Sequence, residues 1–314
     1  MTAVTFFDAW FVGSLGTEAL ASLALVFPFQ ALMQMMAVGA IGGGITSAVA
    51  RAKGSGNLTS AKKIAFNGLL IGMFMSLFYT IILGVFSIHI LGLLSDSKDV
   101  INGAVKYAKV GFGGAILTWL FFSLASVFRG LGDTYTPAKA IVMAGCLQII
   151  MSGLFTLGFV DFVNFGIVGP AAAMIICHAL AAFFLLSQII GPNSLLKLQN
   201  CVFDRSAVLK ILKVGGPGLL NSITIALTIV VITSFVADFG VDALAGYGLG
   251  SRLELMLVPL SFGIGAALTA AVGTNIGADK YNRARSIAKI GAVITFFLTS
   301  VLGLIVAIMP WIWI

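Results

Sequence analysis

Eight long apolar segments dominate this sequence of 314 residues, of which 60% are hydrophobic and only 9% are charged. A helix that crosses the hydrocarbon core of a bilayer needs ~20 mostly apolar residues. Helices satisfy their own backbone hydrogen bonds in lipid, so segments of this length predict membrane-spanning helices. We therefore expect an all-α, polytopic membrane protein. The expected spans are 19–50, 64–94, 110–127, 138–160, 165–190, 214–236, 243–272 and 290–314.

A shorter apolar segment, residues 1–16, precedes these spans and is too short to cross a membrane. We interpret it as the second half of a helix and number it as helix 1, which brings the expected total to nine. Span 110–127 is slightly short, and we expect it to include the turn before it.

The positions of Lys and Arg predict the orientation of the spans, because short cytoplasmic loops are enriched in both. Loops that follow even-numbered helices are basic, so these helices are expected to end in the cytoplasm. The net charge of +7 is thereby explained without a nucleic-acid partner, since the basic residues are spread over several loops. They are Arg51, Lys53, Lys62, Lys63, Arg129, Lys139, Lys197, Arg205, Lys210, Lys213, Lys280, Arg283, Arg285 and Lys289; the opposite loops hold Lys98, Lys106 and Lys109.

One long stretch of the sequence occurs twice. Residues 11–25 read FVGSLGTEALASLAL, and residues 235–249 read FVADFGVDALAGYGL. Gly16 recurs as Gly240 and Gly42 recurs as Gly265, so the second copy is one residue shorter between these two glycines. The offset between the copies covers six helices, an even number, and both copies therefore insert with the same orientation. A parallel repeat predicts two lobes related by an axis along the membrane normal.

The repeat suggests a division of the chain into an N-terminal lobe at 1–190, a linker at 191–213 and a partial C-terminal lobe at 214–314. The linker mixes Leu, Ile and Val with Lys and Arg. This composition favours an amphipathic helix on the cytoplasmic surface.

Three ionisable residues are expected well inside the membrane, where charges are costly and usually face a cavity or a partner. They are Asp8, Arg252 and Glu254. Asp8 and Glu254 are candidates for cation or proton coupling. Alternatively, Arg252 and Glu254 form a structural ion pair, although a spacing of two positions places them on different helix faces. At the repeat offset Asp8 corresponds to Ile232. Glu254 corresponds to Gln30, so each lobe carries one acid that the other lacks.

Uncharged polar residues also lie within the spans, several of them on one helix face at a spacing of four. Such side chains commonly form hydrogen bonds between helices, and the alternative is that they line a site. A lone His within the membrane more often bonds to a neighbour than relays protons. The candidates are Gln148 and Ser152 beside Asp8 for coupling, and Gln30, Gln34, His178, Asn221, Thr224 and Arg252 for a substrate cavity.

Four motifs resemble the multidrug and toxic compound extrusion (MATE) family: DAWFVGSLGTEALA at 8–21, FRGLGDTYTP at 128–137, GIVGPAAA at 166–173 and AGYGLGSRLELMLVPLSFGIGAALTAAVGTNIGA at 245–278. The last is most similar to the DinF-type bacterial branch. The resemblance covers the whole chain and implies two six-helix bundles around a cavity that opens alternately to each side. It implies export of amphiphilic, often cationic compounds in exchange for sodium ions or protons. On this comparison about 8.5 of twelve helices are present, and the start of helix 1 and helices 10–12 are missing.

The resemblance also implies a role for Asp8, which matches a helix-1 acid that binds the coupling cation or proton. The usual partners of that acid are Asn, then Asn or Asp, and Thr, where this chain has Gln148, Ser152 and Met174. The altered partners favour a proton, which needs one carboxylate rather than a cage of oxygens. We therefore expect H⁺, or Na⁺ at Asp8, as the coupling ion, and no other cofactor or metal.

Two other functions were weighed. A lipid-linked oligosaccharide flippase of the same superfamily is expected to have a strongly basic cavity, and Arg252 is the one basic residue well inside a predicted span. The GLGD at 130–133 is typical of intramembrane aspartyl proteases. However, Asp133 lies at the predicted cytoplasmic end and Asp8 towards the outer half, so we expect no enzyme.

We expect a monomer in a bacterial inner (plasma) membrane whose partners are small-molecule substrates and the lipid bilayer, with no nucleic acid. The chain alone is also compatible with an inactive transporter.

Overall fold

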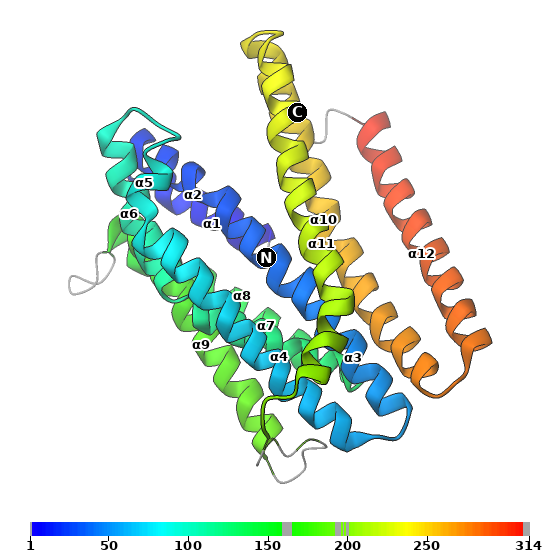
Figure 1. Ribbon diagram of the computed structural model, residues 1–314. Coiled ribbons are helices and arrows are strands. Elements are labelled where there is room, and N and C mark those ends of the chain that lie inside the picture. The colour runs from blue at the N-terminus through cyan, green and yellow to red at the C-terminus, as the bar shows by residue number, and fades with distance from the viewer. Residues whose placement is uncertain (1, 159–164, 192–195, 197, 199–200, 310–314) are drawn as a thin grey trace.

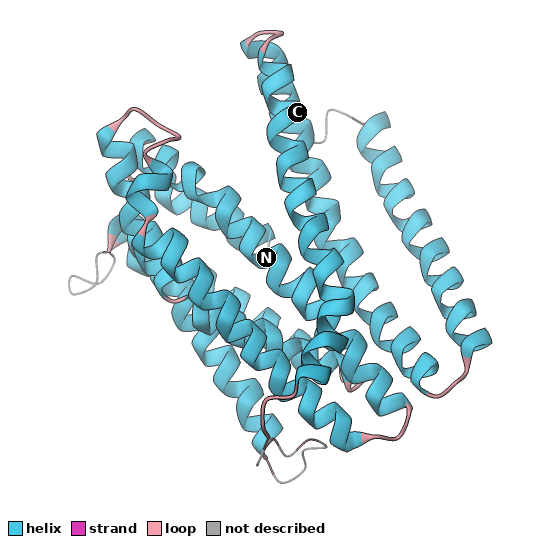
Figure 2. Ribbon diagram, in the orientation of Figure 1, coloured by secondary structure: helices cyan, strands magenta, loops and turns pink. Residues whose placement is uncertain are grey.

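The computed structural model describes the backbone of residues 2–158, 165–191, 196, 198 and 201–309. The side chains at 2, 230, 237, 241–245 and 248–260 lie outside the described residues. The described elements are all helices, as Figure 2 shows, so the all-α prediction is confirmed. Over these residues, six helical segments are long and apolar enough to cross a membrane, and a bent pair makes a seventh.

The helices follow one another with short turns. The first are α1 (Thr2–Gly13), α2 (Thr17–Met35), the π-helix η1 (Met36–Ile41) and α3 (Gly42–Gly54), of which α2, η1 and α3 form one long span. Next come α4 (Leu58–Tyr79), the π-helix η2 (Thr80–Val85), α5 (Ser87–Leu91), α6 (Lys98–Gly113), α7 (Ala115–Gly130) and α8 (Tyr135–Leu157). The chain continues with the 3₁₀ turn η3 (Gly166–Val168), α9 (Gly169–Ile190), α10 (Arg205–Ala237), α11 (Val241–Gly277) and α12 (Tyr281–Ile308).

The span predicted at 110–127 is longer and bent in the structure. It consists of α6 and α7, which meet at an angle of 46° around Gly114. A Cβ at Gly114 would lie 2.6 Å from the side chain of Ile175, so glycine allows α9 to approach the bend. Lys106 and Lys109, predicted in an outer loop, instead lie on the exposed face of α6.

The predicted linker also differs from the expectation of a separate surface helix. Residues 205–213 are the first turns of α10, and residues 201–204 are not helical. Asp204 caps α10 by accepting hydrogen bonds from the backbone N–H groups of Ser206 and Ala207. These bonds, that of Ala207 first, and Lys63 at 3.5 Å hold the pKa of Asp204 below its usual range. The helix begins here because a capping Asp satisfies its first amides.

The two copies of the repeat have equivalent structures. Gly16 and Gly240 precede α2 and α11 with similar backbone angles, φ 118° and φ 100°. The first residues of α4 and α12, Leu58 and Tyr281, correspond in the same register that relates Gly42 to Gly265. Close helix contacts recur as well, since Gly68 packs against Ile45 and Gly291 packs against Leu268 in that register. The structural equivalence supports descent of both stretches from one unit.

The one-residue difference between the copies has a structural explanation. The first copy contains the π-helix η1 at Met36–Ile41, whereas α11 is α-helical over the corresponding stretch. A π-helical turn accommodates one residue more than an α-helical turn. The additional residue of the first copy is therefore absorbed as a local widening of the helix, and the two ends keep their register.

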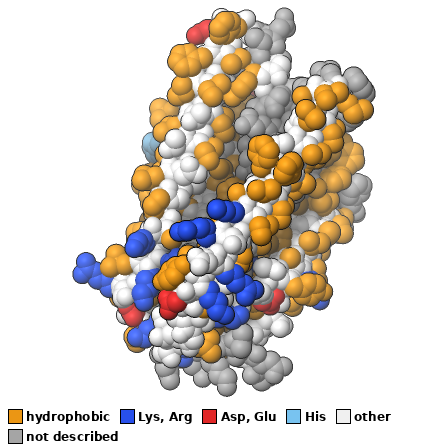
Figure 3. Space-filling model, turned by 90° about the vertical axis from the view of Figure 1, so that its right-hand side faces the viewer, with side chains coloured by type: hydrophobic (Ala, Val, Ile, Leu, Met, Phe, Trp, Pro, Cys, Tyr) orange, Lys and Arg blue, Asp and Glu red, His pale blue; other side chains and the backbone are white. Residues whose placement is uncertain are grey.

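Two groups of helices are visible in Figure 1, α1–α9 on one side and α10–α12 on the other. They converge where α3 and α11 end, and they diverge towards the opposite end of the molecule. In the face that Figure 3 shows, Lys and Arg side chains gather towards the lower end, where the helix groups converge. This is the end with the basic turns after α3 and α11, and it corresponds to the predicted cytoplasmic side.

Candidate functional site

Asp8 is the charged residue of a buried pocket in the first helix group. It lies on α1, which packs against α2 and α8, and 7% of its surface is exposed. The hydroxyl of Ser152 on α8 donates a hydrogen bond of 2.5 Å to Oδ1 of Asp8. Ser152 is fully buried and Gln148, one turn earlier on α8, is 6% exposed. The structure thus brings together Asp8, Gln148 and Ser152, the three residues expected at the N-lobe coupling site.

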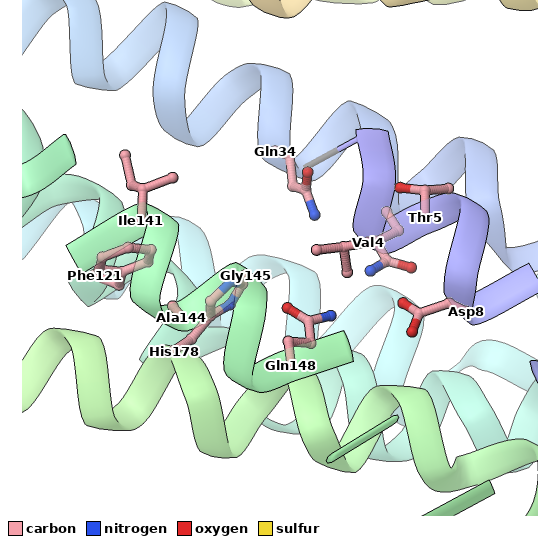
Figure 4. Close-up of a pocket in the computed structure, with 11 residues that line it drawn as sticks. Val4, Thr5, Asp8, Gln34, Phe121, Ile141, Ala144, Gly145, Gln148 and His178 are labelled. Carbon is pink, nitrogen blue, oxygen red and sulfur yellow. The ribbon is translucent and has the colours of Figure 1, made fainter. Parts of the chain in front are cut away.

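The pocket beside Asp8 is small and polar. Figure 4 shows Asp8 from α1, Gln34 from α2 and Gln148 from α8 around one space. Its volume is about 40 Å³. Each water needs roughly 10–15 Å³ measured in this way, so the pocket has room for an ion and a few waters. Pockets that bind drug-sized ligands measure about 300–1,000 Å³. The lining residues are Val4, Thr5, Asp8, Gln30, Gln34, Phe121, Ile141, Ala144, Gly145, Gln148 and His178.

Gln30 connects this pocket to two further helices. Its Oε1 accepts a hydrogen bond of 3.1 Å from the hydroxyl of Tyr107 on α6. Its Nε2 lies 3.0 Å from the sulfur of Met174 on α9. Sequence reasoning missed Tyr107, because it fell in a predicted outer loop. In the sequence Tyr107 stands between Lys106 and Lys109, and this is a weak signal. Only the structure shows that α6 joins α7 in one bent span and that Tyr107 is buried.

His178 lies at the far side of the same pocket. Its Nδ1 lies 3.0 Å from the hydroxyl of Thr118, and its ring packs against the rings of Phe121 and Phe122. It is 3% exposed. The expectation that a lone membrane His bonds to a neighbour is confirmed, and the ring also forms part of the pocket wall.

Two other predicted residues, Asn221 and Thr224, do not line this pocket. Asn221 and Thr224 lie on an exposed face of α10, and the Thr224 hydroxyl donates to the carbonyl of Leu220 in its own helix. Their assignment to a substrate cavity stays a prediction. The side chains of Arg252 and Glu254 lie outside the described residues, although the backbone of α11 passes through both positions.

In a GLGD-type protease the carboxyl groups of Asp133 and Asp8 would have to be in contact, and in this structure they are not. Asp133 precedes α8 and accepts a hydrogen bond from the backbone N–H of Thr136. Asp8 contacts Ser152, which lies near the opposite end of α8. At a rise of about 1.5 Å per residue, the two positions are separated by about 26 Å along α8. Two carboxylates that share a proton have to be in contact.

A second, larger cavity lies between the two helix groups. Its volume is about 340 Å³, which is sufficient for a small organic molecule. We call it the inter-group cavity. Its walls come from η1 and α3 of the first repeat copy, from the end of α7, and from α11 of the second copy. The lining residues are Val38, Gly39, Gly43, Thr46, Arg129, Ser261, Phe262, Gly265, Ala266 and Thr269.

The MatE family model matches residues 1–154 and 217–314, which cover both repeat copies and the lining of the Asp8 pocket except His178. The chain belongs to the MatE family. It is a multi-pass membrane protein, as the helices already indicate.

Curated relatives of this MatE chain are bacterial transporters. The chain is 24% identical over 297 residues to the probable multidrug resistance protein YoeA of Bacillus subtilis, which covers 93% of this chain and 64% of the relative. It is 26% identical over 282 residues to an FAD transporter of Shewanella oneidensis, covering 88% and 62%. A probable multidrug resistance protein NorM of Thermotoga maritima is 22% identical, with 96% and 65% covered. The chain thus spans just under two thirds of the length of these relatives.

Solved structures show the same fold. A MATE transporter in complex with MaD3S has a TM-score of 0.89 at 21% identity, covering 99% of this chain and 70% of that one. A MOP superfamily transporter from Pyrococcus furiosus, whose binding pocket is described as having reverse polarity, has a TM-score of 0.88 at 21% identity and covers 99% and 68%.

Proposed function

We propose that this chain forms part of a secondary exporter that moves amphiphilic compounds across a bacterial inner membrane in exchange for protons. One observation carries the proposal: a buried acid lies in a pocket with room for an ion and water, apart from a cavity with room for a substrate. Separate sites for ion and cargo are compatible with exchange by alternating access. The multidrug resistance relatives support an exporter.

Asp8 would sense the coupling ion through its contacts across α1 and α8. As a carboxylate it accepts the hydrogen bond of Ser152. Protonation removes the charge of Asp8 and adds an O–H donor, so the hydrogen bonds that Asp8 can form with Ser152 and Gln148 change. An ion shifts a conformational equilibrium only by binding one state more tightly than the other. We infer that α1 and α8 change their packing when Asp8 is protonated.

A proton is the coupling ion that the pocket favours. Oε1 of Gln30 is already bonded to Tyr107, and one oxygen of Asp8 is bonded to Ser152. Hard cations prefer about six oxygen ligands. These two hydrogen bonds reduce the number of oxygen atoms in the pocket that could bind sodium. The flippase alternative is not favoured, because Arg129 is the one basic residue among the described residues that line the inter-group cavity.

Vesicle transport tests the proposal. The chain, fused to the C-terminal third of a MatE relative, is reconstituted, and efflux and proton counterflow are measured together. Asp8→Asn should abolish both, whereas Asp96→Asn, a charge removal at an exposed outer-loop acid, should leave both near the wild-type rate. Unchanged coupled efflux in Asp8→Asn would show that the coupling site is elsewhere. Sodium-dependent efflux with no proton counterflow would contradict the choice of ion.

A further inference from the structure

Arg129 is the charged side chain of the inter-group cavity. No Asp or Glu is among the described residues that line this cavity. The ion pair found between described residues, Lys63 with Asp204, lies elsewhere, before the start of α10. Arg129 therefore faces the space between the helix groups without a described counter-charge.

The guanidinium of Arg129 makes one side-chain hydrogen bond to the described residues. A guanidinium has five N–H donors. Nη2 of Arg129 donates to the hydroxyl of Ser126 at 3.0 Å, and Nε is buried with no partner among the described residues. Burying a charged group without compensation is costly, and such a group gains most from a ligand of opposite charge. The unsatisfied donor therefore points to a ligand rather than to a structural role within α7.

The surrounding helices hold Arg129 in place. The Thr46 hydroxyl of α3 donates to the backbone carbonyl of Ser126 at 3.0 Å, and the Ser126 hydroxyl donates to the carbonyl of Phe122. A Cβ on Gly130, the next residue, would lie 2.9 Å from the carbonyl oxygen of Thr46, so α7 and α3 are in close contact there. The last turn of α7 is thus fixed against the first repeat copy, and Arg129 is presented to the cavity by a rigid wall.

The remaining walls complete a site with an apolar body and polar groups at one side. Val38, Phe262 and Ala266 are apolar, and Thr46 and Thr269 add hydroxyl groups. Thr46 and Thr269 are equivalent residues of the two repeat copies. We propose that the inter-group cavity binds the anionic head, a carboxylate or a phosphate, of an amphiphile, with Arg129 as its anchor. Arg pairs with both groups in a bidentate geometry.

This inference rests on the proposed exporter function and specifies the class of its cargo. It differs from the cationic cargo that the family resemblance implies, because a cation in this cavity would meet an uncompensated guanidinium. The anionic group could belong to a transported amphiphile or to the headgroup of an anionic lipid, and both would use the same contacts.

Two probes of equal size and opposite charge test the assignment. The purified chain in phosphatidylcholine nanodiscs is dialysed to equilibrium against 2-naphthoate or 2-naphthylmethylammonium. Naphthoate should bind at least about tenfold more tightly, the smallest effect expected of a hydrogen-bonded charge. Arg129→Gln should remove this preference, whereas Lys139→Gln, the same charge change at an exposed residue of the same end, should preserve it. Equal binding of both probes, or a preserved preference in Arg129→Gln, would overturn the proposal.

A second variant covers a failure of Arg129→Gln to fold. A Cβ at Gly265 would meet no atom within 4 Å, so Gly265→Ala fills part of the cavity without a clash. It should weaken naphthoate binding with an unchanged unfolding temperature, and wild-type binding in this variant would also count against the site. The naphthoate comparison measures binding without a transport step, so its outcome is separate from that of the Asp8→Asn efflux test. Replacing phosphatidylcholine with phosphatidylglycerol should weaken naphthoate binding if the lipid headgroup is the natural ligand, and should leave it unchanged if a transported amphiphile is.

Discussion

The contact between α3 and α11 at the cytoplasmic end predicts that two glycines keep this end closed. A Cβ on Gly277 would stand 2.8 Å from the carbonyl carbon of Arg51, and a Cβ on Gly54 would stand 2.8 Å from that of Thr274. The two contacts are equivalent, because Gly54 and Arg51 of the first copy correspond to Gly277 and Thr274 of the second. The repeat copies therefore cross each other at the symmetry axis, with backbone against backbone.

Gly277→Ala and Gly54→Ala should each push the two helices apart. Ordinary Cβ contacts begin at 3.4 Å, so the helices have to separate by at least about 0.6 Å, and backbone atoms cannot rotate away as side chains do. Inserting a methyl group into a tight contact costs about 1–3 kcal/mol. If this cost falls on the closed state, the ratio of open to closed chains rises by roughly 5- to 150-fold.

Electron–electron distance measurements with spin labels provide the assay. In a background without Cys146, Cys177 and Cys201, labels at Thr59 and Asn282 occupy exposed, equivalent positions at the starts of α4 and α12. Each alanine variant should add a longer-distance population. Gly263→Ala is the matched control on α11, since no atom lies within 4 Å of its Cβ. Distance distributions that are the same for Gly277→Ala, Gly54→Ala and the control would refute the reasoning.

Three smaller perturbations test other contacts. Ser152→Ala removes the hydroxyl that donates to the Asp8 carboxylate and so stabilises its deprotonated form. It should therefore strengthen proton binding about tenfold, as judged by a lower proton concentration that half-saturates efflux. Asn67→Leu should lower stability by about 1–3 kcal/mol in chemical unfolding, because Asn67 is fully buried and bonds to the backbone of Val202 and Asp204; an unchanged midpoint would be inconsistent with this. Asp204→Ala should lower the unfolding temperature more at pH 7 than at pH 2. The pKa of Asp204 is depressed in the folded chain, so its carboxylate stabilises the fold fully above the unfolded pKa of about 3.9, and this stabilisation is lost as the pH falls through the folded pKa. An equal effect at both pH values would exclude a charge contribution.

The apolar segments and the positions of Lys and Arg were sufficient to predict an all-helical membrane protein and the basic end of the molecule. Lipid forces helices to be long and apolar, so their existence is strongly determined by sequence. The ends of the helices are less strongly determined by sequence. The span expected at 19–50 runs from Thr17 to Gly54, because Arg51 and Lys53 remain helical where they reach the polar surface.

The Asp8 pocket was predicted better than the cavity between the helix groups. Gln148 and Ser152 share one face of α8 because they are one helical turn apart, and that face is fixed by its contact with α1. No such constraint fixed the face of α10. The sequence of α10 does not indicate which of its sides faces the protein, so it did not show that Asn221 and Thr224 lie outside the Asp8 pocket.

The π-helix η1 shows what a closer comparison of the repeat copies could have predicted. The change of register between the copies lies between Ala21 and Gly42. Both ends of this helix keep equivalent contacts in the two copies, so the additional residue has to be accommodated between them. The π-helix at Met36–Ile41 accommodates it. Arg129 gave no such signal, because a basic residue at a cytoplasmic helix end is ordinarily solvated and only the packing of α7 against α3 buries it.

The central claim is that Asp8 gains and loses a proton within a pocket too small for the cargo. Infrared difference spectroscopy of the reconstituted chain between acidic and alkaline buffer observes this directly, through the carbonyl stretch of a protonated carboxyl group. We expect a band that disappears in Asp8→Asn and shifts in Ser152→Ala. A spectrum without a band that depends on Asp8 over the pH range in which efflux is coupled would contradict the account.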